Sequence, residues 1–166
     1  MKRLVVAGIV LVCGILAGCS SKTAAPSTQS AAGPSGVDVG SVVVVLGDSI
    51  SADARKIVDE VNGVARLKTA IDGELGKAGR LKTGSTRVLE IKVSEFRLRS
   101  GATVFWAGIM SGVDTLQVHA VVREGSRTVR EFDTGDSTSG AFAGLSSSSR
   151  FQTMTDAVAE RVKKEL

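Results

Sequence analysis

Ser49 and His119 are the two residues of this chain whose types suit nucleophilic catalysis. Ser49 ends the triplet Gly47-Asp48-Ser49, which directly follows an apolar run over residues 42–46. A serine hydroxyl is a poor nucleophile by itself, so ester hydrolysis requires a base within hydrogen-bonding reach. His119 is the only histidine in the sequence. A serine hydrolase built from this chain would therefore have to bring His119 to Ser49.

An apolar strand followed by Gly-Asp-Ser resembles the nucleophile block of the GDSL (SGNH) esterases and lipases. The resemblance implies attack by Ser49 on an ester, with a histidine as base. That family places a D-x-x-H pair near the C-terminus, whereas Asp114 precedes His119 by five positions in mid-chain. The family's G-x-N-D block is also missing, because Asn62 is the only asparagine. We therefore predict no enzymatic activity and keep a GDSL-like esterase that uses Ser49 and His119 as the alternative.

Other catalytic and metal chemistry has little support in the sequence. The triplet Asp133-Thr134-Gly135 resembles that of aspartic proteases, which need two such aspartates facing each other. Asp136 follows the triplet where that family has Ser, Thr or Ala, and these are also ordinary turn residues. A single histidine and two cysteines leave too few ligands for a zinc site, and no dinucleotide or Walker motif occurs. We predict no metal and no dissociable cofactor.

The N-terminus has the layout of a secretory signal that ends in a lipid attachment site. Lys2 and Arg3 precede an apolar run over residues 4–16. This run is shorter than the about 20 apolar residues of an ordinary transmembrane helix. It ends in Leu16-Ala17-Gly18-Cys19, which resembles the lipobox of bacterial lipoprotein precursors. The resemblance implies cleavage between Gly18 and Cys19, a diacylglycerol on the Cys19 thiol and an acyl chain on its new amine.

The residues around Cys19 also predict a location. Ser20 follows the cysteine, and in the sorting rule of enteric-type bacteria a residue other than aspartate here directs a lipoprotein to the outer membrane. We therefore expect a lipid-anchored protein on the periplasmic face of the bacterial outer membrane. Cys13 lies in the removed signal and Cys19 is alkylated, so the mature chain has no disulfide. The net charge of +4 is mild, and we predict no nucleic-acid partner.

The sequence divides into three parts. Residues 1–18 are the predicted lipoprotein signal peptide, 19–40 the lipidated N-terminus and a flexible linker, and 41–166 a periplasmic α/β domain. The linker is made of small and polar residues with both prolines of the chain, which cannot build a core. A flexible chain of this length has an end-to-end distance of about 25 Å, so we expect the domain to stay near its membrane.

The domain shows patterns of strands and amphipathic helices. Continuous β-branched residues over 41–47 predict a strand covered on both faces. Apolar residues every three or four positions predict a helix over 53–78, which its glycines can divide in two. The expected elements that follow are a strand over 86–99 with a bulge near Ser94 and Glu95, a hairpin of 115–123 and 127–133, a loop over 135–150 and a helix over 151–166. This β-α-β-β-β-α order predicts an α+β fold with a single mixed, mostly antiparallel sheet and helices on one face.

A glycine-flanked apolar segment, residues 101–112, separates two of the expected strands. An exposed loop without a contact function rarely contains so many apolar side chains. The candidate interface residues are Val104, Phe105, Trp106, Ile109 and Met110. One interpretation is that they extend the core or the strands. The other is that they form a contact surface for a partner protein, for a second copy of the chain or for lipid headgroups.

The stretch VLEIKVSEFRLRSGATVFWAGIMSGVDTLQVHAVVREG, with the lipobox before it and an amphipathic helix after it, resembles the bacterial lipoprotein family labelled domain of unknown function 4410. The resemblance covers roughly residues 42–166 and implies an envelope location and an α/β fold more than an activity. We predict a non-enzymatic membrane-anchored lipoprotein that acts as a binding, adaptor or assembly component of an envelope complex. Its expected partners are the membrane, through the lipid, and an envelope protein or further copies of itself.

Overall fold

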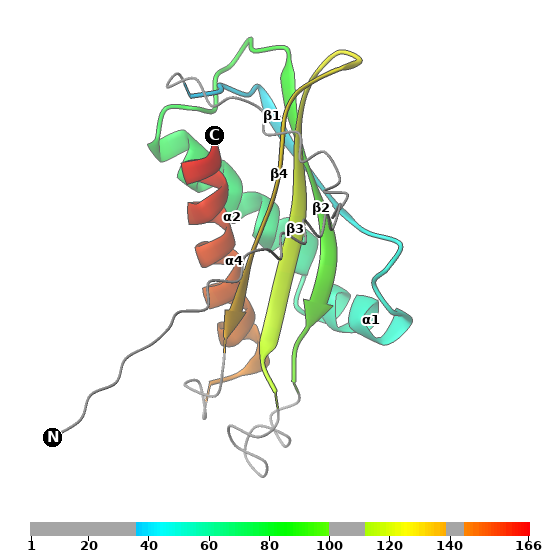
Figure 1. Cartoon of the computed structure of the whole chain (residues 1–166). Coiled ribbons are helices and arrows are strands. Elements are labelled where there is room, and N and C mark those ends of the chain that lie inside the picture. The colour runs from blue at the N-terminus through cyan, green and yellow to red at the C-terminus, as the bar shows by residue number, and fades with distance from the viewer. Residues whose placement is uncertain (1–35, 100–111, 139–144) are drawn as a thin grey trace, which may run out of the picture. The chain divides into compact units, whose positions relative to one another are not determined.

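A computed structural model of the chain describes residues 36–99, 112–138 and 145–166 (Figure 1). Its elements, in chain order, are β1 (Ser41–Leu46), α1 (Ala52–Glu60), α2 (Gly63–Lys77), β2 (Arg87–Arg97), β3 (Asp114–Glu124), β4 (Arg127–Thr138) and α4 (Ser147–Glu165). They belong to one compact unit, Ala32–Leu166. None of the helices in the described ranges is long and apolar enough to cross a membrane.

The four strands form one sheet in the order β1-β2-β3-β4. β1 pairs with β2 in parallel, and the other two pairings are antiparallel. The predicted α+β fold with a mixed, mostly antiparallel sheet is therefore confirmed. The predicted bulge is also present, because the register of β2 against β3 shifts between Val93 and Glu95. Gly125, with a φ of 60°, makes the turn between β3 and β4.

Helices α2 and α4 lie side by side on one face of the sheet (Figure 1). Alternate residues of the central strands and the apolar stripes of both helices meet between these layers. The buried residues that make up this core include Leu89, Ile91, Val93, Leu116, Val118, Ala120 and Val122 from the sheet, and Leu67, Ile71, Leu75, Phe151, Met154, Val158 and Val162 from the helices. Among the residues that the structure describes, no helix packs on the other face of the sheet, which is called the helix-free face below.

The helical segment between β1 and β2 is divided in two, as predicted. The division falls at Asn62, which takes a left-handed conformation with a φ of 54°. Ser51 caps the N-terminus of α1, because its side-chain oxygen accepts a hydrogen bond from the Ala54 amide at 3.2 Å. Gly63 begins α2 at a close approach, since a Cβ there would stand 2.8 Å from Val58 Cγ1 and 3.0 Å from Phe151 Cζ.

Two of the sequence predictions about this domain are wrong. β1 is not covered on both faces: Val43 is 45% exposed and Val45 is 48% exposed, because the helices pack on one face only. The predicted loop over residues 135–150 is also too long. β4 continues to Thr138 and α4 begins at Ser147, where the Ser146 side chain accepts a hydrogen bond from the Ser149 amide at 3.1 Å.

Candidate functional site

The helix-free face of the sheet is the candidate functional site. Because side chains alternate along a strand, the register aligns those of this face into rows across the four strands. One row is Val45, Lys92, His119 and Asp133, and the next is Val43, Glu90, Val121 and Glu131. The β1 part of the face is thus apolar, and the part formed by β2, β3 and β4 is mostly charged.

The charged part of this face is largely paired within itself. The Nδ1 atom of His119 lies 2.9 Å from Asp133 Oδ1, and its Nε2 atom lies 3.3 Å from Glu131 Oε1. Arg123 Nε donates to Glu90 Oε2 at 2.8 Å, which joins β3 to β2. Such exposed pairs contribute little to stability, but they satisfy the charges they contain. The valines of β1 therefore stand out on this face, because they are apolar side chains exposed to solvent.

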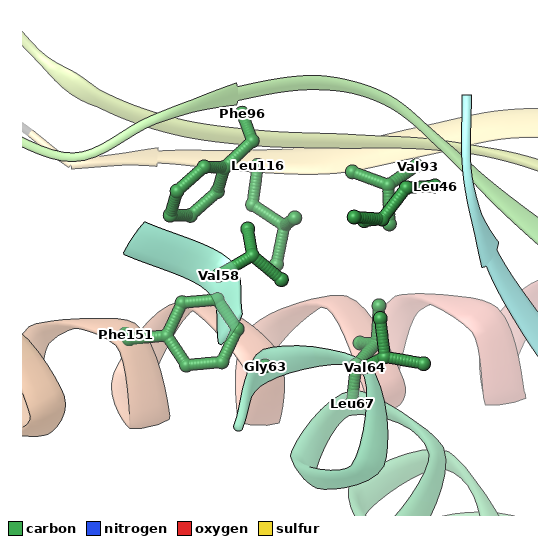
Figure 2. Close-up of a pocket in the computed structure, with 9 residues that line it drawn as sticks. All are labelled: Leu46, Val58, Gly63, Val64, Leu67, Val93, Phe96, Leu116 and Phe151. Carbon is green, nitrogen blue, oxygen red and sulfur yellow. The ribbon is translucent and has the colours of Figure 1, made fainter. Parts of the chain in front are cut away.

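A groove of about 380 Å³ follows this face, lined by Val43, Val45, Glu90, Lys92, His119, Val121 and Arg123. That volume is in the range of sites that hold a small ligand or part of a peptide. A cavity of about 10 Å³ between the sheet and the helices is lined by apolar side chains, including Val58, Phe96 and Phe151 (Figure 2). It is about the size of one water molecule, so it does not hold a ligand.

The structure does not bring Ser49 and His119 together. The Ser49 hydroxyl donates a hydrogen bond of 2.7 Å to the Ser94 carbonyl, at the end of β1. His119 lies two strands from β1, with Lys92 between it and Val45 in the register. Two strand spacings amount to roughly 10 Å. Within the described residues, no hydrogen bond joins Ser49 to a histidine or a carboxylate, so a base for this nucleophile is not in place.

The carboxylates next to His119 are not the one considered from the sequence. Asp133 and Glu131 reach it from β4, whereas Asp114 is buried at the start of β3. Counting residues back from the Gly125 turn could have indicated that His119 pairs with β4. The count is off by one residue, however, because the register of β3 against β4 shifts between Val122 and Arg123. The described ranges contain no group of three His, Cys, Asp or Glu side chains arranged to hold a metal ion.

Asp114 is the centre of a buried charged cluster. Its Oδ1 atom accepts hydrogen bonds from the Arg99 amide at 2.9 Å and from Arg99 Nε at 3.0 Å, and its Oδ2 atom accepts one from Arg150 at 2.5 Å. Arg99 also donates to the Gly112 carbonyl at 2.6 Å. The cluster therefore joins the segment that directly follows β2, the start of β3 and the first turn of α4.

The remaining predicted sites lie outside the described residues. They are the cleavage and lipidation site, Gly18 and Cys19, and the interface candidates Val104, Phe105, Trp106, Ile109 and Met110. The described residues that flank the interface candidates in the sequence are Arg99 and Gly112. Arg99 donates a hydrogen bond to the Gly112 carbonyl and another to Asp114. Sequence patterns did not reveal this cluster, because its three charged members lie far apart in the chain: Arg99 just after β2, Asp114 in β3 and Arg150 in α4.

No protein-family model matches this sequence, and a search of curated proteins also finds no match. The resemblance to the domain-of-unknown-function 4410 family therefore stays a prediction. Among solved structures, the chain is similar to a dodecameric PelC variant from Paraburkholderia phytofirmans, with 16% identity, 78% of this chain and 91% of that chain covered, and a TM-score of 0.45.

Two further similar structures come from other bacteria. A minor lipoprotein from Acinetobacter baumannii has 12% identity, with 75% of this chain and 90% of that chain covered and a TM-score of 0.40. A Xanthomonas campestris protein of domain-of-unknown-function family 330 has 17% identity, with 61% and 57% covered and a TM-score of 0.39. Each TM-score lies below 0.5, so the fold assignment rests on the chain's own topology.

Proposed function

We propose that this chain is a non-enzymatic lipoprotein of the bacterial outer membrane, whose periplasmic domain binds a protein partner as a component of an envelope assembly. The binding role is supported by one observation on the helix-free face of the sheet: Val43 and Val45 are about half exposed there and line a groove of about 380 Å³. Exposed apolar side chains gathered beside a groove are typical of contact surfaces. The membrane role rests on the lipobox that ends in Cys19.

An enzymatic role has less support. A serine nucleophile requires a neighbouring base, and the Ser49 hydroxyl instead donates to the Ser94 carbonyl. His119 lies in the sheet, between the carboxylates of Glu131 and Asp133. We therefore expect the purified domain not to hydrolyse short esters. Hydrolysis that disappears in Ser49→Ala would support the esterase instead.

The membrane anchor is tested by metabolic labelling of the full chain with a radioactive fatty acid. We expect label on the wild-type protein, none on Cys19→Ala, and unchanged label on Cys13→Ala, which alters the signal but not the lipobox cysteine. The Ser20→Asp variant tests location, because it should move the protein from the outer to the inner membrane fraction. Equal labelling of Cys19→Ala and wild type would contradict the anchor.

The binding role is tested by photo-crosslinking in cells. A photoreactive amino acid at Val45 should crosslink a defined envelope protein, and the same amino acid at Asp53, an exposed position on α1, serves as the control. A band specific to Val45 that persists in the lipidated protein supports a contact on this face. Identical bands from both positions, or none, would contradict the proposed contact face.

A further inference from the structure

One end of the domain gathers the starts of β1, β2 and β4 with the ends of β3, α2 and α4 (Figure 1). The Val37 amide donates to the Leu166 carbonyl at 2.7 Å, which joins the entering chain to the end of α4. The Val39 amide donates to the Arg80 carbonyl at 2.9 Å, which joins it to the segment after α2. This end, at which the chain enters the domain, is called the entry pole and consists of residues 36–40, 74–88, 123–130 and 162–166.

The charges of the described residues are divided unevenly between the entry pole and the rest of the domain. The entry pole has nine basic side chains and four acidic ones. The remaining described residues have nine basic and thirteen acidic side chains. The basic side chains of the pole are Lys77, Arg80, Lys82, Arg87, Arg123, Arg127, Arg130, Lys163 and Lys164. The domain is therefore nearly neutral as a whole but positive at the end where the chain enters.

Most basic side chains of the entry pole have a structural partner. Those with an ion pair or a hydrogen bond are Lys77, Arg80, Arg87, Arg123, Arg130, Lys163 and Lys164. Three of them stand in the last turn of a helix, where a cation also offsets the helix dipole. Lys82 and Arg127 are exposed, and neither forms a hydrogen bond or an ion pair with any described residue. Structural roles thus leave these two cations unexplained.

Lys82 and Arg127 stand at opposite edges of the sheet. The Lys82 amide donates to the Val39 carbonyl at 2.8 Å, directly before the edge strand β1. Arg127 begins β4, the strand at the other edge. The start of β2 and the end of β3 lie between them and contribute Arg87 and Arg123. The positive charge therefore extends across the whole width of the pole, which suits an extended anionic surface better than a single small anion.

The proposed lipid anchor determines which extended surface is near the pole. The linker joins Cys19 to this end of the domain, and a flexible chain of this length spans about 25 Å. Such a tether gives the pole a high effective concentration at the membrane. Anionic headgroups attract basic side chains that come within about 8–10 Å, and each such side chain strengthens binding roughly fivefold. A membrane thus complements the pole in charge, in extent and in position.

We propose that the entry pole lies against anionic phospholipid headgroups of the membrane that holds the lipid anchor, with Lys82 and Arg127 as contact cations. The strands run from this pole to the opposite one, so the sheet stands upright on the membrane and presents its helix-free face sideways to a partner. Arg99 and Gly112 lie at the far ends of β2 and β3, away from the membrane. This inference rests on the proposed anchor and adds which surface of the domain meets the lipid.

The first test measures vesicle binding by the soluble domain and does not need the anchor. It uses the compact unit, residues 32–166, which contains the whole buried core. The protein is sedimented with vesicles of phosphatidylglycerol and phosphatidylcholine in equal amounts, and with vesicles of phosphatidylcholine alone. We expect binding to the anionic vesicles only. Raising the salt concentration from about 0.05 M to about 0.5 M should weaken this binding at least about tenfold, because salt screens exposed charges.

Two double variants connect this binding to the entry pole. Lys82→Ala with Arg127→Ala removes both unpaired cations and should weaken vesicle binding at least about tenfold. Lys56→Ala with Lys68→Ala removes the same net charge from α1 and α2, outside the pole. This control should bind within about twofold of the wild type. All four side chains are exposed, so neither variant disturbs the core.

The second test measures the orientation of the lipidated full chain in the same anionic vesicles. A fluorophore is attached to a cysteine introduced by Ser126→Cys, in the β3–β4 turn of the entry pole, or by Asp53→Cys, on α1 at the opposite end. In the proposed mature chain the introduced cysteine is the only free thiol. Lipids with spin-labelled headgroups should quench the fluorophore at position 126 strongly and the one at position 53 little.

Several outcomes would overturn the proposal. They are equal sedimentation with both kinds of vesicle, an equal loss of binding in the two double variants, or stronger quenching at position 53. Absence of vesicle binding, with a photo-crosslink from position 126 to an acidic protein in cells, would make that protein the occupant. Fatty-acid labelling of Cys19 without vesicle binding would reject the membrane contact and leave the anchor in place. Vesicle binding through Lys82 and Arg127 without such labelling would reject the anchor and support the contact.

Discussion

Asp114 and Arg150 form an ion pair of 2.5 Å between β3 and the first turn of α4, and both side chains are almost fully buried. Burial by itself would raise the pKa of the Asp114 carboxyl. The hydrogen bonds from Arg99 and the charge of Arg150 outweigh that effect, so the Asp114 pKa lies below its usual value. The pair therefore holds a buried negative charge in place at the junction of three elements.

Asp114→Asn should destabilise the domain strongly. The amide has nearly the shape of the carboxylate but no charge, so Arg99 and Arg150 lose the buried negative charge that Asp114 places beside them. Breaking a buried pair in this way costs about 3 kcal/mol or more in the free energy of unfolding. Urea denaturation measures this loss. The matched variant Asp133→Asn, at an exposed carboxylate, should change stability by less than about 1 kcal/mol.

The same pair predicts how stability depends on pH. The folded pKa of Asp114 lies below its unfolded value of about 3.9, so its contribution is complete above that value and is lost as pH falls through the folded pKa. The stability difference between wild type and Asp114→Asn should be constant from about pH 5 to 8 and shrink below about pH 4. A difference that instead grows on acidification would show that the carboxyl is protonated in the folded state.

Glu74 provides a second test of electrostatics, on the outer surface of α2. Hydrogen bonds from Lys163 at 2.5 Å and from Lys77 at 2.8 Å lower its pKa from 4.5 to about 2. An NMR titration of the side-chain carboxyl should give this low pKa, and Lys163→Met should raise it toward the usual value. Lys164→Met is the control, since Lys164 pairs with Glu160 and should move that carboxyl's pKa instead.

Hydrophobic patterns predicted most of the fold because they reflect which face of an element is buried. The apolar stripe over residues 53–78 predicted the helical segment, its glycines suggested the division in two, and the phase change in β2 predicted the bulge near Glu95. The run of valines in β1 misled for a physical reason. Apolar residues on both faces of a strand normally indicate cover on both sides, but β1 is an edge strand with helices packed on one face only, so Val43 and Val45 stay half exposed. Contacts across the sequence, such as Asp114 with Arg150, leave no periodic signal.

Neighbouring valines of β1 offer a direct measure of which face is covered. Val44 is 8% exposed and faces the core, whereas Val45 is 48% exposed on the helix-free face. Val44→Ala removes buried methyl groups and should cost about 2 kcal/mol in the free energy of unfolding. Val45→Ala should cost less than about 0.5 kcal/mol in the same denaturation experiment. Equal losses would mean that both faces of β1 are covered in the isolated domain.

Alanine substitutions at Gly63 and Gly73 distinguish the effect of close packing on stability from the effect of helix propensity, because both glycines lie in α2. A Cβ at Gly63 would stand 2.8 Å from Val58 Cγ1 and 3.0 Å from Phe151 Cζ, beside the small cavity in Figure 2. Gly63→Ala should therefore destabilise the domain by about 1–3 kcal/mol, because a filled core must shift to admit the methyl group. A Cβ at Gly73 has nothing within 4 Å, so Gly73→Ala should stabilise by up to about 1 kcal/mol through helix propensity alone.

Thermal or urea denaturation of the two variants decides between these effects. If Gly63→Ala is as stable as Gly73→Ala, the approach of α2 to Phe151 is looser than the structure indicates. Repacking offers a further check, because Val58→Ala removes the Cγ1 atom that the new methyl group would meet. The double variant Val58→Ala, Gly63→Ala should then be more stable than the sum of the two single losses predicts. Such non-additivity is expected only where the two side chains are in contact.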